Sequence, residues 1–173
     1  MTTRMKTRKI ILHKDEILYD VEGYAYKFTE AAGLEGKAKN TVAADHNETL
    51  DGRLLARMMD ARDAQLRKKL KFAVFASSAE VSCNKPDEAQ EYVYSLWLAD
   101  KFDDTLLGAI KVQMHEYIVR GTLLDWYKKL NIQSNAVDAG EIAELEESIA
   151  SSLRTPSYTR APLQPFGPAK PTI

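Results

Sequence analysis

The clearest pattern of apolar positions in this chain lies between residues 104 and 130. Apolar or small residues recur there at spacings of three and four for about six turns, which is the period of one buried helix face. Asp103 or Asp104 can cap the start of such a helix, and Asn131 is expected to end it. The pattern predicts a long helix with the buried positions Leu106, Leu107, Ile110, Met114, Tyr117, Ile118, Gly121, Leu124 and Tyr127.

Three further segments carry apolar residues at helical spacing. The first begins at Asp15 and is expected to stop at Gly33, and Gly23 allows a break inside it. Asp51 can cap the second, and the third follows the capping-box sequence Asp138–Glu141. Their apolar stripes are Ile17, Leu18, Val21, Tyr24, Ala25 and Phe28; Leu54, Leu55, Met58, Met59, Leu66, Leu70 and Val74; and Ile142, Leu145, Ile149 and Leu153.

Two segments favour strands. Residues 92–99 are rich in aromatic side chains and alternate with period two, which indicates a strand, although a short apolar run also leaves a helix open. Lys9–Leu12 is a short β-branched run of the kind found in edge strands, and the polar stretches 34–50 and 77–89 are predicted to be loops. The alternating apolar positions are Tyr92, Tyr94, Leu96 and Leu98.

These elements predict a mainly α protein, a helical bundle of three or four main helices with a small β element. The length of 173 residues fits one domain with tails, since domains contain roughly 100–200 residues. We expect a basic N-terminal arm at 1–14, a helical domain at 15–153 and a proline-rich extended arm at 154–173.

The charge is unevenly distributed along the chain. The formal net charge is −1, yet residues 1–14 carry five cations and residues 154–173 carry three, with no acid in either segment. The stretch 15–153 therefore has a charge of −9. An acidic body with two basic ends can attract a second copy of itself or an anionic partner.

The last 20 residues combine five prolines with scattered apolar side chains. Proline at this density forbids helices and favours an extended, polyproline-like chain. Tyr158, Leu163 and Phe166 supply apolar anchors, and Arg160 lies between them. An extended segment with an apolar residue every few positions is suited to docking into a groove on a partner.

Motifs of catalysis are missing from the sequence. It contains neither a phosphate-binding glycine loop nor a nucleophile elbow nor a zinc-protease helix motif. His115 is expected to pack or to form a hydrogen bond, the consecutive ligands at 45–48 fan outward rather than converge on a metal, and Cys83 has no nearby histidine. We therefore expect no enzyme, no cofactor and no metal.

Four segments resemble a known class of protein. They are IILHKDEILYDV at 10–21, YVYSLWLADKF at 92–102, HEYIV at 115–119 and LLDWY at 123–127. Together they resemble head–tail connector (neck adaptor) proteins encoded among the structural genes of tailed phages. Those proteins are small, helical and ring-forming, and they commonly carry an extended terminal arm that lies along the portal or the next ring. The resemblance covers about half of the chain.

The resemblance implies a virion structural protein that is assembled in the host cytoplasm. It implies a homo-oligomeric ring in the neck that joins portal or capsid to tail, contacts portal and tail proteins and touches the packaged DNA without sequence specificity. Such proteins have no catalytic motif, so no functional residue is carried over. The residues we expect to bind partners are Tyr158, Leu163, Phe166 and Arg160 in the C-terminal arm, and Arg4, Lys6, Arg8 and Lys9 in the N-terminal arm.

The alternative is a small nucleic-acid-binding or regulatory module. It would use the basic N-terminal arm together with the cations of residues 67–71, although helix-dipole complementarity also explains that cluster. An enzyme is the third and least favoured class. No stretch approaches the roughly 18 apolar residues of a membrane span, and the N-terminus lacks the apolar core of a secretory signal. We therefore expect no membrane partner.

Overall fold

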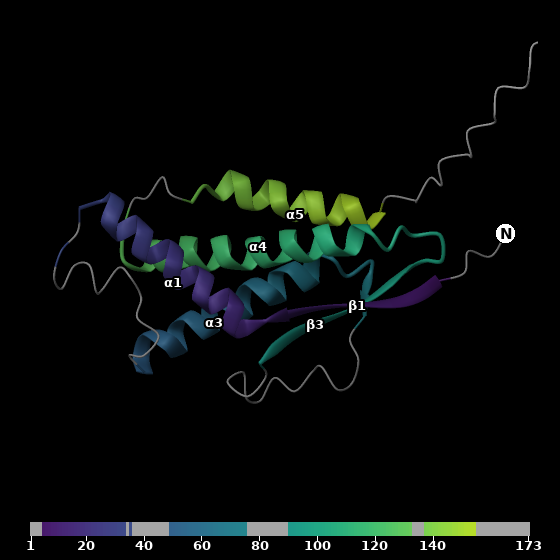
Figure 1. Ribbon diagram of the computed structural model, residues 1–173, viewed down its shortest axis with the longest axis horizontal. Helices are drawn as coiled ribbons and strands as arrows, with labels where there is room; N and C mark the ends of the chain where they lie inside the picture. The colour runs from purple at the N-terminus through teal and green to yellow at the C-terminus, as the bar shows by residue number, and fades with distance from the viewer. Residues whose placement is uncertain (1–4, 34, 36–48, 76–89, 133–136, 155–173) are drawn as a thin grey trace, which may run out of the picture.

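The computed structural model of the protein describes residues 5–33, 35, 49–75, 90–132 and 137–154. These residues form four helices and a three-stranded sheet, which confirms a mainly α protein with a small β element (Figure 1). None of the described helices is both long and apolar enough to cross a membrane. In chain order the elements are β1 (Met5–His13), α1 (Lys14–Ala31), α3 (Thr49–Lys69), β2 (Val74–Phe75), β3 (Glu91–Ala99), α4 (Leu106–Lys129) and α5 (Ala139–Arg154).

The sheet is antiparallel, with β3 in the middle and the order β1-β3-β2. The alternating segment at 92–99 lies in β3, so the strand prediction is confirmed. The run Lys9–Leu12 lies in the edge strand β1, where Ile10 is paired with Tyr94 and Leu12 with Tyr92. Period-two burial turns these side chains toward the helices, which gives the sheet one apolar face.

The predicted boundary of the N-terminal arm is wrong for residues 5–14. Residues 5–13 form the whole of β1 and Lys14 starts α1, so this basic segment belongs to the domain. Ile10 is 3% exposed and Leu12 is fully buried. Burying these two aliphatic side chains contributes about 3–6 kcal/mol, which is enough to hold this segment in the domain although several of its residues are basic.

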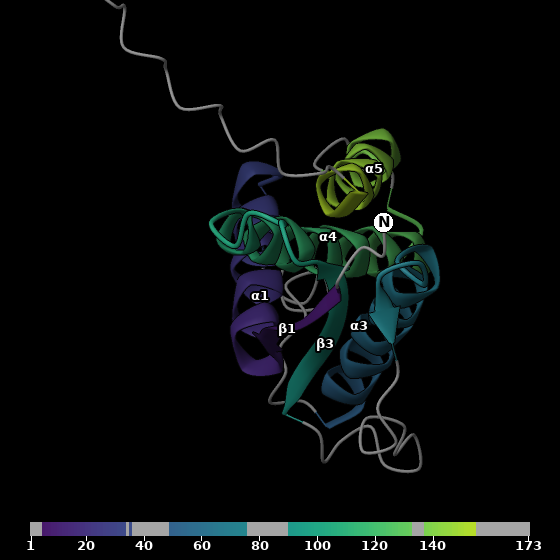
Figure 2. The same cartoon turned by 90° about the vertical axis from the view of Figure 1, so that its right-hand side faces the viewer.

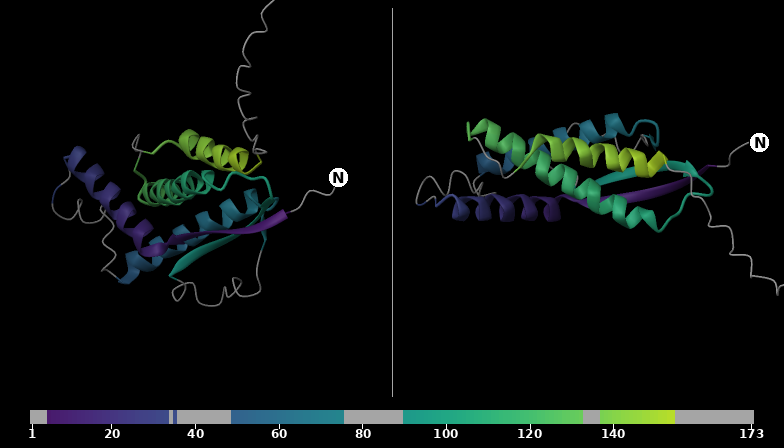
Figure 3. Two further views of the ribbon diagram at one scale, coloured as in Figure 1. Left: turned by 45° about the vertical axis from the view of Figure 1, so that its right-hand side comes forward. Right: turned by 90° about the horizontal axis from the view of Figure 1, so that it is seen from above.

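Helix α4 is the centre of the domain. It contacts α1, α3, α5 and β1, and ten of its residues are buried. Figure 2 shows α1 and α3 on either side of the strands, with α4 crossing above them. Figure 3 shows α5 packed beside α4 in the left view and crossing over it obliquely in the right view. A helix surrounded in this way has no fully polar face, which agrees with its long run of apolar positions.

The helix ends follow the predicted signals in two places. Gly33 has φ +65° just after α1, and Asn131 has φ +54° just after α4. Glycine adopts this left-handed conformation at little cost, and asparagine tolerates it better than most residues. Asp103 does not cap α4 directly but accepts hydrogen bonds from the backbone N–H and the hydroxyl of Thr105, the N-cap residue.

Four details of the predicted helices are wrong. Leu106, expected in the buried stripe of α4, is 37% exposed at the start of that helix. Helix α3 starts at Thr49, so Asp51 lies inside it and is not its cap. Val74 belongs to β2 rather than to the stripe of α3. Tyr24 is 42% exposed, because the buried stripe of α1 follows Ala25 instead. The helix also runs through Gly23 without a break.

The capping box of α5 is half formed. Asp138 accepts a hydrogen bond from the Gly140 N–H at 2.8 Å, as an N-terminal cap does. The side chain of Glu141 is instead engaged by Arg120 of α4. Ile142, at 5% exposure, follows directly and starts the buried stripe of the helix.

A polar network joins α3 to β3 inside the core. The Tyr94 hydroxyl donates to Asp63 Oδ1 at 2.5 Å, and the Tyr92 hydroxyl donates to Asp60 Oδ1 at 2.7 Å. Arg67 donates to the second oxygen of Asp63 at 2.7 Å and lies over the Tyr94 ring. Burial, and then the neighbouring aspartate, raise the pKa of both phenols. The network ties α3 to the sheet through two hydroxyl–carboxylate hydrogen bonds, while Asp60 Oδ2 is buried and receives no hydrogen bond from the described residues.

A second polar contact joins α3 to α4. Arg62 donates from Nε and Nη2 to the two carboxylate oxygens of Asp125, at 2.7 and 2.5 Å. Burial alone would lower the pKa of Arg62, but its bonds to Asp125 outweigh this effect and raise it. The arginine stem lies against Gly121, where an added Cβ would be 2.6 Å from Arg62 Cδ. Glycine at position 121 thus leaves room for the Arg62 side chain to reach Asp125 along the surface of α4.

Replacing Asp125 with alanine is expected to lower the free energy of unfolding by about 2 kcal/mol. The Arg62 side chain is only 12% exposed and would lose both carboxylate acceptors. Urea unfolding followed by circular dichroism measures the loss. Lys128→Ala on the exposed face of the same helix is the control, with an expected change within about 0.5 kcal/mol. Equal values for the two variants would contradict the assignment.

Candidate functional site

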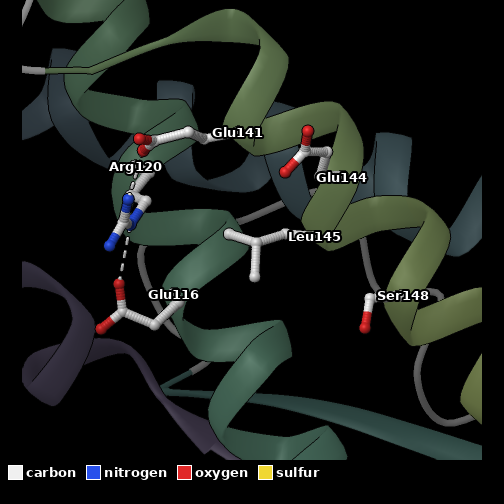
Figure 4. Close-up of a pocket in the computed structure, with 6 residues that line it drawn as sticks. All are labelled: Glu116, Arg120, Glu141, Glu144, Leu145 and Ser148. Atoms are coloured by element: carbon white, nitrogen blue, oxygen red, sulfur yellow. Dashed lines mark hydrogen bonds and ion pairs between the residues drawn. The ribbon is translucent and has the colours of Figure 1, made fainter.

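Helices α4 and α5 form a groove of about 330 Å³ along their contact (Figure 4). Helix α4 brings two residues four positions apart, and α5 brings residues at 141, 144, 145 and 148. These spacings place each set on one helix face, so the two faces meet across the groove. Its lining residues are Glu116, Arg120, Glu141, Glu144, Leu145 and Ser148.

The groove is acidic. Arg120 donates from Nε to Glu116 at 3.0 Å and from Nη1 to Glu141 at 2.6 Å, and these contacts raise its pKa, with the Glu116 hydrogen bond as the largest cause. Three carboxylates therefore face one guanidinium, a formal excess of two negative charges. Glu144 is exposed, and no cation among the described residues forms an ion pair with it. The groove has one carboxylate available for an incoming cation.

The remaining lining offers an apolar wall and a hydrogen-bonding site. Leu145 is half-buried and packs against the core. Ser148 accepts a hydrogen bond from the Gln113 amide at 3.1 Å. Within the described part of the chain, Gln113 Oε1 is buried and receives no hydrogen bond. Gln113 is not among the residues that line the groove, so Ser148 is the polar group that this end of the lining presents.

The chemistry of the groove favours a cationic side chain rather than a metal ion. Across the described residues, no three His, Cys, Asp or Glu side chains converge as metal ligands. A guanidinium or ammonium group needs only one free carboxylate and a neighbouring acceptor. The groove is therefore suited to a basic peptide segment.

A second surface lies on the sheet, on the side opposite the tyrosines that contact α3. We call it the outer sheet face. By the register of the two strands it includes Met5, Thr7, Lys9, Ile11, Val93, Ser95 and Trp97, of which Ser95 is buried. Trp97 is 56% exposed and Met5 46%, while Thr7 is paired with Trp97 across the two strands. Exposed tryptophan is enriched at protein interfaces, so this face is a candidate contact surface.

Two of the N-terminal cations expected to bind partners, Lys6 and Arg8, form ion pairs inside the domain. Arg8 is 9% exposed, donates to Asp104 and lies 5.7 Å from the centre of the Phe102 ring. Lys6 forms an ion pair with Asp100, and its hydrogen bond lowers the pKa of that carboxyl. These contacts fasten β1 to the turn after β3, so Arg8 is a structural cation. Lys9 is exposed on β1.

The other predicted partner-binding residues lie outside the described residues. They are Arg4 at the N-terminus and Tyr158, Arg160, Leu163 and Phe166 in the C-terminal arm.

The basic cluster at the end of α3 is also partly engaged. Arg67 contacts Asp63 and the Val93 carbonyl, and Lys69 lies 3.3–3.4 Å from Glu146 and Glu147. The other two members of the cluster, Lys68 and Lys71, are exposed. Two of the four cations thus connect α3 to neighbouring elements in addition to complementing the helix dipole.

The histidines of the described residues serve contacts between elements. His115 Nε2 lies 2.8 Å from Asp20, which links α4 to α1 and matches the expected hydrogen-bonding role. His13 lies 3.2 Å from Glu91 across the strand pair. The segment 45–48 and Cys83 lie outside the described residues.

The sequence interpretation did not identify Arg120 or the groove. Glu116 and Arg120 are four positions apart on a helix, which is a recognisable ion-pair signal. The pairing with Glu141 needs α5 to fold back along α4, and no local pattern reveals that.

Comparison with known protein families, with curated proteins and with solved structures finds no match.

Proposed function

We propose that the protein is a structural subunit that assembles with copies of itself into a ring. In the neck of a tailed-phage virion, that ring joins portal or capsid to tail around the DNA passage. The virion context rests on the resemblance of the segments at 10–21, 92–102, 115–119 and 123–127 to connector proteins.

The exposed Trp97 on the outer sheet face carries the proposal of assembly. A tryptophan that is 56% exposed, with Met5 and Thr7 beside it on the same face, offers apolar area that a partner can bury. Tryptophan is among the residues that contribute most to binding free energy at interfaces.

The groove provides a second, chemically different surface. Figure 1 shows α5 on one side of α4 and the sheet on the other. A ring needs one patch that meets a different patch on the next subunit, rather than one patch that meets itself. The outer sheet face and the α4–α5 groove are two different patches on one domain, so each can meet a different part of a neighbouring subunit.

Nucleic-acid binding by the domain receives less support. Four of the cations it would use, Lys6, Arg8, Arg67 and Lys69, already have acidic partners in the fold. Phosphates would have to compete with those carboxylates, so we keep DNA contact as a minor property of the assembled ring.

Replacing Trp97 with alanine is expected to weaken self-association by about thirtyfold, which corresponds to about 2 kcal/mol. The reason is loss of the largest exposed apolar side chain on the outer sheet face. Light scattering over a range of concentrations measures the association constant, and negative-stain electron microscopy shows whether the oligomers are rings.

Tyr19→Ala is the matched control, since Tyr19 on α1 is 76% exposed and does not belong to the outer sheet face. It is expected to leave association unchanged. A parent protein that stays monomeric at all concentrations and binds duplex DNA with a steep dependence on salt would contradict the proposal and favour the nucleic-acid module.

A further inference from the structure

We infer that the α4–α5 groove binds the C-terminal segment 155–173 of a neighbouring copy, with Arg160 at Glu144. This inference rests on the proposed self-assembly and names the contact that would join successive subunits. It follows from the charge of the groove, its polar lining and the position at which the described domain ends.

Charge complementarity selects the C-terminal segment as the occupant. The groove has an excess of two negative charges, and Glu144 is exposed without a cation from the described residues. Residues 155–173 contain Arg160 and Lys170 and no acid. The N-terminal cations Lys6 and Arg8 are already paired in β1, so they are poorly suited to this role.

The lining of the groove suits an arginine within an apolar segment. A guanidinium has five donors in a planar fork, enough to reach a carboxylate and a second acceptor together. Glu144 supplies the carboxylate, and Ser148 lies one turn further along α5. Leu145 between them can pack against an apolar side chain, and Leu163 follows Arg160 by three positions.

The direction of α5 favours a neighbouring copy over the chain's own tail. Arg154 ends α5 and lies ten residues, or about 15 Å, beyond Glu144. A tail that filled its own groove would have to reverse direction at once. Pro156 fixes its own φ and disfavours a helical conformation at the preceding residue, which favours an extended chain there. A tail that continues outward instead meets the groove of the next subunit.

Charge exchange in the full-length protein tests the inference. Glu144→Lys and Arg160→Glu, made separately, are each expected to weaken association at least tenfold, because each places like charges together. The two variants mixed in equal amounts are expected to recover association, since each groove then meets a complementary tail on the other chain. Glu30→Lys on the exposed surface of α1 is the control and is expected to have no effect.

Each outcome separates this inference from the proposed function. Rings that form equally well with both charge variants would overturn the groove contact and leave the ring proposal standing. Recovery only when both changes are in one chain would mean that each tail fills its own groove, which overturns the contact between neighbours. A parent protein that never associates would overturn the ring proposal, and the contact with it. Far-UV circular dichroism of each variant checks that the helices remain folded.

Discussion

Replacing Asp63 with alanine is expected to lower the free energy of unfolding by about 3 kcal/mol. Asp63 is 9% exposed and accepts hydrogen bonds from both the Tyr94 hydroxyl and Arg67. Without it, the hydroxyl of a fully buried tyrosine loses its acceptor and the guanidinium loses its carboxylate. Urea or guanidinium unfolding at pH 7 measures the loss.

A double-mutant cycle with Tyr94→Phe tests the physical reason for this loss. The phenylalanine variant alone is expected to lose about 1 kcal/mol, and in the Asp63→Ala background it is expected to lose almost nothing. Arg57→Ala on an exposed position of the same helix is the control. Additive losses for Asp63 and Tyr94 would contradict the hydrogen bond between them.

The second large effect is expected at alkaline pH. Burial is the main cause that raises the pKa of Tyr92, Tyr94, Tyr117 and Tyr127, and the pKa of Tyr127 is raised to about 12. Above about pH 10 the unfolded chain releases phenolic protons that the folded chain retains. The contribution of these phenols to the free energy of unfolding is therefore fully present below pH 10. It is lost as the pH rises, by up to about 1.4 kcal/mol per pH unit for each such tyrosine.

Urea unfolding between pH 9 and 12 measures this slope, and the ultraviolet absorbance of phenolate reports ionisation directly. Tyr127→Phe keeps the buried ring and removes one ionising group, so the slope above pH 10 is expected to become shallower. A parent protein whose stability is constant between pH 10 and 12 would contradict the expected burial of these phenols.

Local patterns predicted most of the elements because their signals are strong. The stripe of α4 repeats over many turns, and its end at Asn131 agrees with the left-handed conformation found there. Alternation identified β3. Tyr24 was placed on the wrong face because a spacing of three or four leaves the direction of a stripe uncertain by one position, and Ala25 carries little hydrophobic signal.

Local sequence patterns could not predict the contacts between distant segments. The basic residues of β1 were expected to form an arm because cations at a chain end are commonly solvated. Arg8 instead donates a hydrogen bond to Asp104, which lies 96 positions away in the sequence. The residues near Arg8 in the sequence do not indicate this partner. The groove shows the same limit, since Arg120 and Glu141 belong to helices whose packing depends on the whole core.

The pairing of the first strand with β3 has a consequence for biosynthesis. Strand β1 leaves the ribosome before β3, and Tyr94, the partner of Ile10, is translated 84 positions after it. At about 5–20 residues per second, Ile10 and Leu12 wait several seconds without the strand that pairs with them. Long-range pairing of this kind also slows folding, because the loop must close before the contact forms. Strand β1 therefore reaches its native pairing only after β3, which ends at Ala99, has been synthesised.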